Sequence, residues 1–300
     1  MKTSVLASRR IAMIGLGDLG AAVATRLVDR GARVIGVRRG TDAPRGVELL
    51  RADLGDPGSL AALPADIEGM VVSITPDRYD VEGYRNTYLA AAENLAVALA
   101  DRPIVRALWV SSTSVYGSAE AASADVQAKE GHAAAELDES FPAVPESDRG
   151  RVLLEAERAL AAGGWPVTAV RLAGIYGPGR SALIERVRQG RGVPAAPVQW
   201  TNRIHRDDAA DALVFLLEQA FAGTDLPDAV IGSDGASAPR HEVLAWLADR
   251  LGVELTAVDD DGGRSPSRRL RPRVLQELGF RWRYPDYRSG YAAMLEATHR

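Results

Sequence analysis

A glycine-rich turn near the N-terminus limits the fold of this chain more than any other feature. Residues 15–20 have the pattern G-x-G-x-x-G, after an apolar segment and before an amphipathic one. In a strand–turn–helix unit, the first glycine permits the tight turn, the second lets the backbone approach a pyrophosphate, and the third lets helix and strand pack closely. The first amides of the helix then face the phosphates. The motif predicts a dinucleotide site, the alternative being a glycine turn that binds nothing. The predicted contacts are Gly15, Leu16, Gly17, Asp18, Leu19 and Gly20.

Apolar segments with the length of strands alternate with amphipathic segments through the first 173 residues. This alternation predicts an α/β Rossmann fold, in which helices cover both faces of a doubly wound parallel sheet. Loops rich in glycine and proline follow. We predict a Rossmann domain over residues 1–173 and a smaller, mainly substrate-binding lobe over 174–300, with a return of the chain to the first domain around 205–235. The predicted strands are 11–14, 33–37, 47–51, 69–74, 104–111, 167–172 and 229–232, and the longest predicted helix is 81–100.

The composition excludes several kinds of partner. The 300 residues carry a net charge of −4, so the chain offers no basic field for nucleic acid. It has no cysteine, and its four histidines form no ligand pattern, so we expect neither disulfides nor a metal site. No apolar run is long enough to span a bilayer, and residues 1–10 do not resemble a signal peptide. We therefore expect a cytoplasmic protein that binds a small molecule. Residues 119–136 are polar and poorly patterned, and we expect a mobile excursion there.

Two arginines stand where the second predicted strand ends. Sites for NAD usually carry an acidic residue about 20 residues after the glycine motif, which binds the adenosine ribose. Here that place is taken by Arg38 and Arg39. A guanidinium binds a 2′-phosphate through charge-assisted hydrogen bonds, whereas a carboxylate would repel it. These residues predict NADP(H) in preference to NAD(H); the alternative is a solvated arginine pair.

Two further pairs of residues follow predicted strands at positions suited to the cofactor. Asp53 and Leu54 follow the third strand, where an aspartate can hold the adenine amino group; the alternative is that Asp53 caps a helix beginning near Asp56. Ile74 and Thr75 end the fourth strand, near the expected nicotinamide ribose; the alternative for Thr75 is a turn residue. We predict that both pairs contact the cofactor.

Five further segments occur in an order that covers most of the chain. They are 110–117 (VSSTSVYG), 139–142 (ESFP), 171–179 (RLAGIYGPG), 204–210 (IHRDDAA) and 278–280 (LGF). This series resembles the extended short-chain dehydrogenase/reductase superfamily, in its NAD-dependent epimerase/dehydratase group. The resemblance implies that Ser112 faces the nicotinamide and the substrate carbonyl. It also implies that the Gly-Pro loop, with Tyr176, borders the same cleft, and that the C-terminal lobe holds the substrate.

The chain departs from that family in its catalytic pair. Members usually carry Tyr-x-x-x-Lys on the helix after the fifth strand, but the only lysines here are Lys2 and Lys129, and neither has a tyrosine four residues before it. When Glu157 is aligned with the glutamate usual in the family, Arg149 takes the tyrosine position and Leu153 the lysine position. The chain thus resembles the atypical subgroup of the superfamily.

The missing lysine limits the chemistry. Without a lysine to lower its pKa, a tyrosine near pKa 10 is a poor base but an adequate acid, which favours reduction of a carbonyl. We predict that Ser112 contacts that carbonyl; the alternative is a hydroxyl that only bonds the backbone. Tyr116 is the candidate acid, with packing under the loop as its alternative. Strand alternation places Ser114 and Tyr116 on the same face if the strand extends that far, and we predict that Ser114 then contacts the substrate.

Charged residues outside the cofactor motifs are candidates for substrate binding. Arg149 and Arg180 are suited to hold a carboxylate or phosphate of the substrate, with surface arginines as the alternative. His205 is a candidate contact too, although a lone histidine beside a helix start is more often structural. Asp207 and Asp208 resemble helix caps rather than metal ligands.

Taken together, the patterns predict an NADP(H)-dependent oxidoreductase acting on a carbonyl or hydroxyl of a small polar, sugar-like substrate. An epimerase or dehydratase is the enzymatic alternative, but it must first oxidise an alcohol and so needs a base. A non-catalytic NADP(H) sensor or scaffold is the other alternative. The alanine-rich helix 81–100 fits either a homodimer interface or packing on the sheet.

Overall fold

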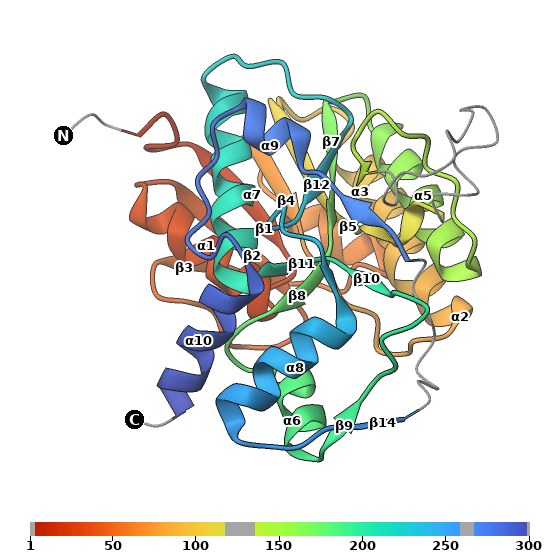
Figure 1. The fold of residues 1–300 in the computed structure, drawn as a ribbon. Coiled ribbons are helices and arrows are strands. Elements are labelled where there is room, and N and C mark those ends of the chain that lie inside the picture. Colours follow the sequence, from red (N-terminus) through yellow and green to blue (C-terminus); the bar gives the residue numbers. More distant parts are fainter. Residues whose placement is uncertain (1–3, 118–135, 259–266, 299–300) are drawn as a thin grey trace. The chain divides into compact units, whose positions relative to one another are not determined.

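The chain forms two compact units. The computed structural model describes residues 4–117, 136–258 and 267–298, so nearly all of the expected excursion at 119–136 lies outside the described residues (Figure 1). Unit 1 comprises residues 1–115, 145–171 and 210–230, and unit 2 comprises 116–144, 172–209 and 231–300. The sequence places 116–144 in the first domain, whereas these residues cluster with unit 2.

A seven-stranded sheet forms the centre of unit 1, which confirms the predicted α/β fold with a doubly wound parallel sheet. The strand order is β12-β7-β5-β4-β1-β2-β3. The pairs β1–β2, β1–β4, β2–β3 and β4–β5 are all parallel. The strands are β1 (Arg10–Ile14), β2 (Arg33–Arg38), β3 (Val47–Arg51), β4 (Gly69–Val72), β5 (Arg106–Ser112), β7 (Val167–Leu172) and β12 (Ala229–Gly232). Because the strand order reverses between β1 and β4, the loops that follow these two strands diverge and leave a crevice.

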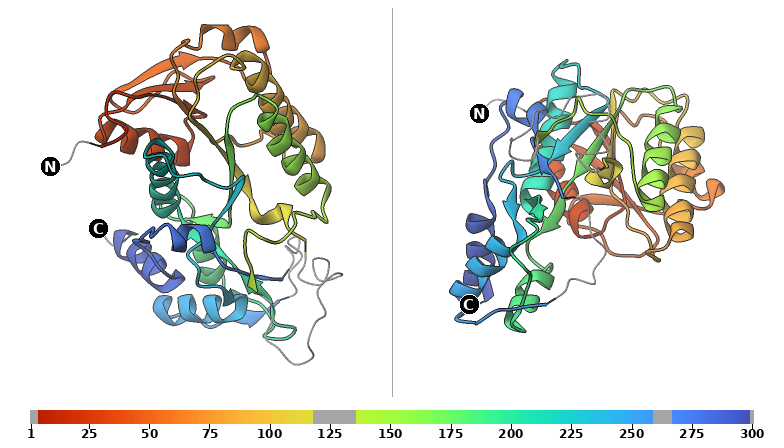
Figure 2. Two further views of the ribbon diagram at one scale, coloured as in Figure 1. Left: turned by 90° about the horizontal axis from the view of Figure 1, so that it is seen from above. Right: turned by 45° about the vertical axis from the view of Figure 1, so that its right-hand side comes forward.

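Helices cover both faces of this sheet (Figure 2). On one face α3 packs against α5, and their leucines join the core with Trp109 and Trp165. On the other face α1 is joined to α7 by the ion pairs Arg26–Asp211 and Arg30–Glu218, at 2.6 and 2.8 Å. The helices are α1 (Asp18–Asp29), α3 (Ala90–Ala98), α5 (Asp148–Ala161) and α7 (Arg206–Phe221).

The predicted helix 81–100 is divided into three parts. A short helix α2 (Val81–Tyr84) leads into the π-helical segment η2 (Arg85–Leu89), and α3 follows. Asp80 caps the first part, because its carboxylate accepts a hydrogen bond from the amide of Gly83 at 2.7 Å. A π-helical turn is rare and is frequently found at functional sites.

Unit 2 is built from short strand pairs and helices around an aromatic core. Tyr176, Leu244, Leu247, Tyr287 and Tyr291 belong to this core. Within the residues that the structure describes, no helix has the length and apolarity needed to cross a bilayer. The strands are β6 (Glu136–Leu137), β8 (Gly174–Tyr176), β9 (Arg191–Gly192), β10 (Trp200–Thr201), β11 (Arg203–His205), β13 (Ala238–Pro239), β14 (Thr256–Ala257) and β15 (Arg269–Leu270). The helices are α6 (Ala182–Arg188), α8 (Arg240–Leu251), α9 (Arg273–Glu277) and α10 (Tyr287–Thr298).

Candidate functional site

The turn between β1 and α1 has room for glycine alone at two of its three glycine positions. Gly15 has φ +88°, and a Cβ on it would lie 2.2 Å from the backbone oxygen of Ser73. A Cβ on Gly20 would lie 1.9 Å from the backbone oxygen of Gly15. The amide of Gly15 donates to the carbonyl of Val37 at 2.8 Å, which joins the turn to β2. These contacts fix a tight turn directly above the sheet.

The middle glycine faces open space. A Cβ on Gly17 would meet nothing within 4 Å, and no side chain caps the N-terminus of α1 at this residue. Asp18 is exposed in the first helical turn, whereas Leu19 is buried in the core. The site therefore offers uncapped helix amides and unobstructed backbone to an anion, and this cradle fits the diphosphate of a dinucleotide.

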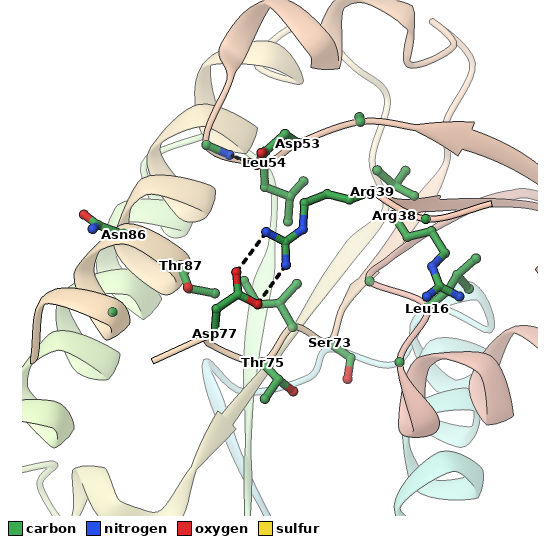
Figure 3. Close-up of a pocket in the computed structure, with 18 of the residues that line it drawn as sticks. Leu16, Arg38, Arg39, Asp53, Leu54, Ser73, Thr75, Asp77, Asn86 and Thr87 are labelled. Atoms are coloured by element: carbon green, nitrogen blue, oxygen red, sulfur yellow. Dashed lines mark hydrogen bonds and ion pairs between the residues drawn. The ribbon is translucent and has the colours of Figure 1, made fainter. Parts of the chain in front are cut away.

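A cavity of about 690 Å³ adjoins this turn within unit 1 (Figure 3). Nine of the predicted cofactor contacts line it, namely Gly15, Leu16, Gly17, Arg38, Arg39, Asp53, Leu54, Ile74 and Thr75. Sequence reasoning missed eight further polar or glycine residues of the lining, namely Gly40, Gly55, Ser73, Asp77, Arg78, Gly83, Asn86 and Thr87. The polar run after the fourth strand was the available signal, because ligands of parallel sheets bind beyond the carboxyl ends of the strands.

The two arginines at the end of β2 have different partners. Arg39 forms a bidentate ion pair with Asp77, with N–O distances of 2.8 and 2.9 Å. Arg38 donates from Nη1 to the backbone oxygen of Asp42 at 3.0 Å. Both arginines line the cavity, as the NADP(H) prediction requires. Arg38 donates to an uncharged backbone oxygen, whereas Arg39 donates to a charged carboxylate.

The residues after β3 separate two roles that the sequence left open. The carboxylate of Asp56 caps the short 3₁₀ helix η1 (Pro57–Ala62) by accepting from the amide of Gly58 at 3.0 Å. Asp53 instead lines the cavity, and its Oδ1 accepts from the amide of Gly55 at 3.0 Å. Asp53 thus belongs to the cavity lining, and its contact with an adenine amino group stays a prediction.

The helical segment beside the cavity holds the loop that follows β4. Tyr88, in the π-helical segment η2, donates its hydroxyl to the backbone oxygen of Ile74 at 3.3 Å. Its ring meets the ring of Trp109 edge-on, at a centroid distance of 6.3 Å. The next residue in the loop is Thr75, so this contact orients a predicted cofactor residue.

Strand β5 ends at the predicted catalytic serine. The hydroxyl of Ser112 accepts a hydrogen bond from the amide of Ser114 at 3.1 Å and retains its own proton for donation. The 3₁₀ turn η3 (Thr113–Val115) follows at once, so strand alternation does not extend to Ser114 and Tyr116. The condition for that alternation is not met, because the serine-capped turn ends the strand at Ser112, and the substrate contact of Ser114 and the acid role of Tyr116 stay predictions.

The helix after β5 carries the positions of the missing catalytic pair. Arg149 lies in the first turn of α5, donates to the backbone oxygen of Tyr79 at 3.3 Å, and places its guanidinium over the ring of Tyr84. Leu153, at the lysine position, is buried in the core. Arg149 is thus exposed at the same carboxyl end of the sheet as Ser112, and its role in substrate binding stays a prediction.

The remaining predicted residues belong to unit 2. Tyr116 and His205 are only 1% and 2% exposed, and the Nδ1 atom of His205 accepts from the amide of Asp207 at 3.2 Å. Tyr176 and Arg180 line a second cavity, of about 800 Å³. Among the described residues no three His, Asp or Glu side chains come together as a metal site would require.

Arginines dominate the second cavity. Arg203 is 6% exposed, and its Nη1 atom has no hydrogen-bond partner among the described residues. Burial and the neighbouring charge of Arg186 lower the pKa of Arg240, so positive charges crowd one another here. Among the described residues of the lining, Glu185 is the one carboxylate, and it is paired with Arg188. The cavity is therefore suited to an anionic group, and its arginines are Arg180, Arg186, Arg191, Arg203 and Arg240.

A buried carboxyl group beside Arg203 makes the stability of the protein depend on pH. Burial raises the pKa of Asp234 to about 7; the charges of Asp286 and Asp208 also raise it, whereas Arg203 and the amide of Ala236 lower it. Between the unfolded pKa near 4 and the folded pKa, the folded state holds a proton that the unfolded state has lost. Stability therefore falls as the pH rises through this window.

Asp234→Asn removes the titrating carboxyl group. Between pH 5 and pH 7, we expect the unfolding free energy of the wild type to fall by on the order of 1–2 kcal/mol more than that of this variant. Urea unfolding of both proteins at each pH measures the difference. Parallel stability curves for the two proteins would show that Asp234 is ionised in the folded state throughout this range.

Comparison with known proteins agrees with the class that the glycine turn and sheet define, a dinucleotide-binding Rossmann protein. The model of the NAD-dependent epimerase/dehydratase family matches residues 11–232. Protein YeeZ of Escherichia coli K12 is 31% identical over 293 residues, which cover 93% of this chain and 97% of YeeZ. A solved structure from Methylobacillus flagellatus, described as a candidate NAD-dependent epimerase/dehydratase, is 33% identical, with a TM-score of 0.76 and coverage of 98% and 99%.

More distant structures share the fold. MoeE5, solved with UDP-glucuronic acid and NAD, is 22% identical, with a TM-score of 0.75 and coverage of 97% of this chain and 99% of MoeE5. The match over residues 11–232 and the 31% identity to YeeZ together confirm the resemblance: this chain belongs to the NAD-dependent epimerase/dehydratase family.

Proposed function

We propose that the protein is an NADP(H)-dependent oxidoreductase that acts on a carbonyl or hydroxyl group of a small polar, sugar-like substrate carrying an anionic group. The observation that supports it best is the cavity of unit 1, in which the open backbone at Gly17 and two arginines occupy one lining. Family membership supports a nicotinamide cofactor. The preference for the 2′-phosphate form rests on Arg38 and Arg39.

Each lining residue has a role in this proposal. The amides at the start of α1 hold the diphosphate, Arg38 binds the 2′-phosphate, and Asp53 accepts from the adenine amino group. Thr75 contacts the nicotinamide ribose. When bound, the cofactor supplies or accepts a hydride. Ser112 donates a hydrogen bond from its hydroxyl to the substrate oxygen and so orients the reacting carbonyl.

The arginines that line the second cavity support the proposal that the substrate carries an anionic group. A substrate phosphate or carboxylate would satisfy the buried Nη1 atom of Arg203 and relieve the repulsion between Arg186 and Arg240. The absence of a Tyr-x-x-x-Lys pair in the sequence supports reduction rather than oxidation. Reduction of a carbonyl needs a proton donor, which a side chain with an ordinary pKa can supply, whereas oxidation of an alcohol needs a base.

An epimerase or dehydratase is the second candidate, and family membership favours it. Such an enzyme returns its hydride to the substrate in each cycle, so the cofactor shows no net oxidation. It also needs a base for the first step, and no residue predicted here supplies one.

Stopped-flow measurement of NADPH oxidation tests the proposal. With a panel of ketones, ketosugars and phosphorylated ketoses, we expect net oxidation of bound NADPH, fastest with a phosphorylated ketose. Ser112→Ala should slow this step about tenfold while leaving NADPH affinity unchanged, because one hydrogen bond to the reacting oxygen is lost. Tight NADPH binding without turnover of any compound would instead support a non-catalytic sensor, and isomerised product without net oxidation would support the epimerase.

A further inference from the structure

The charge on Arg39 is matched by a carboxylate from another loop of the same cavity. Asp77 follows β4, and its two carboxylate oxygens accept from Nη2 and Nη1 of Arg39 at 2.8 and 2.9 Å (Figure 3). A guanidinium binds a phosphate through the same fork of two parallel hydrogen bonds. Asp77 therefore occupies the Nη1–Nη2 edge of Arg39, one of the two edges through which a guanidinium can bind a 2′-phosphate.

The electrostatic surroundings of Arg39 reinforce this competition. The hydrogen bonds and charge of Asp77 raise the pKa of Arg39, and the charge of Asp53 adds to the effect. In return, Arg39 holds the pKa of Asp77 below its usual range. A phosphate dianion placed at Arg39 would lie close to both carboxylates and would be repelled by them.

The neighbouring arginine provides the contrast. Arg38 donates from Nη1 to a backbone oxygen, that of Asp42, which carries no net charge to compete with a phosphate. Two adjacent arginines that look equivalent in the sequence thus differ in the structure. Arg38 forms no ion pair in this contact, whereas a phosphate that approaches the Nη1–Nη2 edge of Arg39 must displace Asp77.

We propose that Asp77 is a specificity-determining residue, which weakens the binding of the 2′-phosphate by competing for Arg39. This inference rests on the proposed use of NADP(H). A cofactor with a free 2′-hydroxyl leaves the Arg39–Asp77 pair intact, whereas one with a 2′-phosphate must displace the carboxylate or bind beside it. Asp77 consequently narrows the discrimination between NADPH and NADH that the two arginines would otherwise give.

Fluorescence titrations of the full-length protein with NADPH and with NADH test this role. The ratio of the dissociation constant for NADH to that for NADPH should rise about two- to fivefold in Asp77→Asn, the range that exposed ion pairs contribute. The affinity for NADH should stay unchanged. When Asp77→Asn is added to Arg39→Ala, the ratio should not rise further, because the guanidinium for which Asp77 and the phosphate compete is no longer present.

Glu155→Gln is the matched control. It removes one negative charge from an exposed ion pair with Arg85, at 3.2 Å, and neither residue lines the cavity, so it should leave the ratio unchanged. An unchanged ratio in Asp77→Asn would overturn the inference, and so would an equal rise when Asp77→Asn is made in the Arg39→Ala background. In either case, binding of NADPH by the wild type would still support the proposed function. Failure of the wild type to bind either nucleotide would overturn the proposed function and this inference with it.

Discussion

Glu157→Gln is expected to lower the free energy of unfolding by about 3–5 kcal/mol, because it removes the negative charge that pairs with a buried arginine. Glu157 and Arg171 are 7% and 8% exposed, and Nη2 of Arg171 lies 2.7 Å from Oε2 of Glu157. The other carboxylate oxygen accepts from the hydroxyl of Ser111, on β5. The glutamate therefore joins α5 to β5 and β7 through a charge that the glutamine lacks.

Guanidinium chloride unfolding of the variant and the wild type measures this loss. Glu155→Gln on the same helix is the matched control, because Glu155 pairs at 3.2 Å with Arg85 and both side chains are exposed by more than 40%. Exposed pairs contribute about 0–1 kcal/mol. Equal losses in the two variants would contradict the role assigned to the buried pair.

Gly17→Val is expected to lower NADPH affinity about 100-fold or more while leaving the fold stable. The valine side chain would enter the open space in front of the backbone, where the diphosphate must approach the helix amides. Blocked contacts of this kind cost about 3 kcal/mol, which corresponds to that change in affinity. The backbone at Gly17 has φ −72°, which valine adopts without strain.

Calorimetric titration gives the affinity, and urea unfolding checks the stability of the same preparation. We expect the unfolding free energies of Gly17→Val and the wild type to agree within about 0.5 kcal/mol, as is usual for exposed positions. Retained affinity in a stable variant would show that the nucleotide does not approach Gly17. A collapse in stability would show that the space in front of this residue is not open.

The features that the sequence predicted well are local ones. The glycine turn could be predicted because Gly15 and Gly20 are required by contacts within one strand–turn–helix unit. The strands could be predicted because buried parallel strands consist of short apolar runs bounded by polar turns. Arg38, Arg39 and Asp53 follow such strands, so their position at the cavity followed from the fold class.

The features that were missed depend on contacts between distant segments. The residues around Asp77 have no pattern that predicts its ion pair with Arg39, because this pair joins two loops 38 residues apart. The π-helical segment could not be predicted, because residues 81–98 have the composition of one continuous helix. The assignment of 116–144 to unit 2 follows from tertiary contacts, such as the hydrogen bond from the amide of Ile231 to Glu139.

Titration of the wild-type protein with NADPH, followed by calorimetry, tests the central claim most directly. Uncapped helix amides, an open backbone at Gly17 and the guanidinium of Arg38 predict saturable one-to-one binding that weakens when salt is added, because charged contacts are screened. The absence of saturable binding by NADPH and by NADH at millimolar concentration would contradict the assignment of this cavity to a dinucleotide.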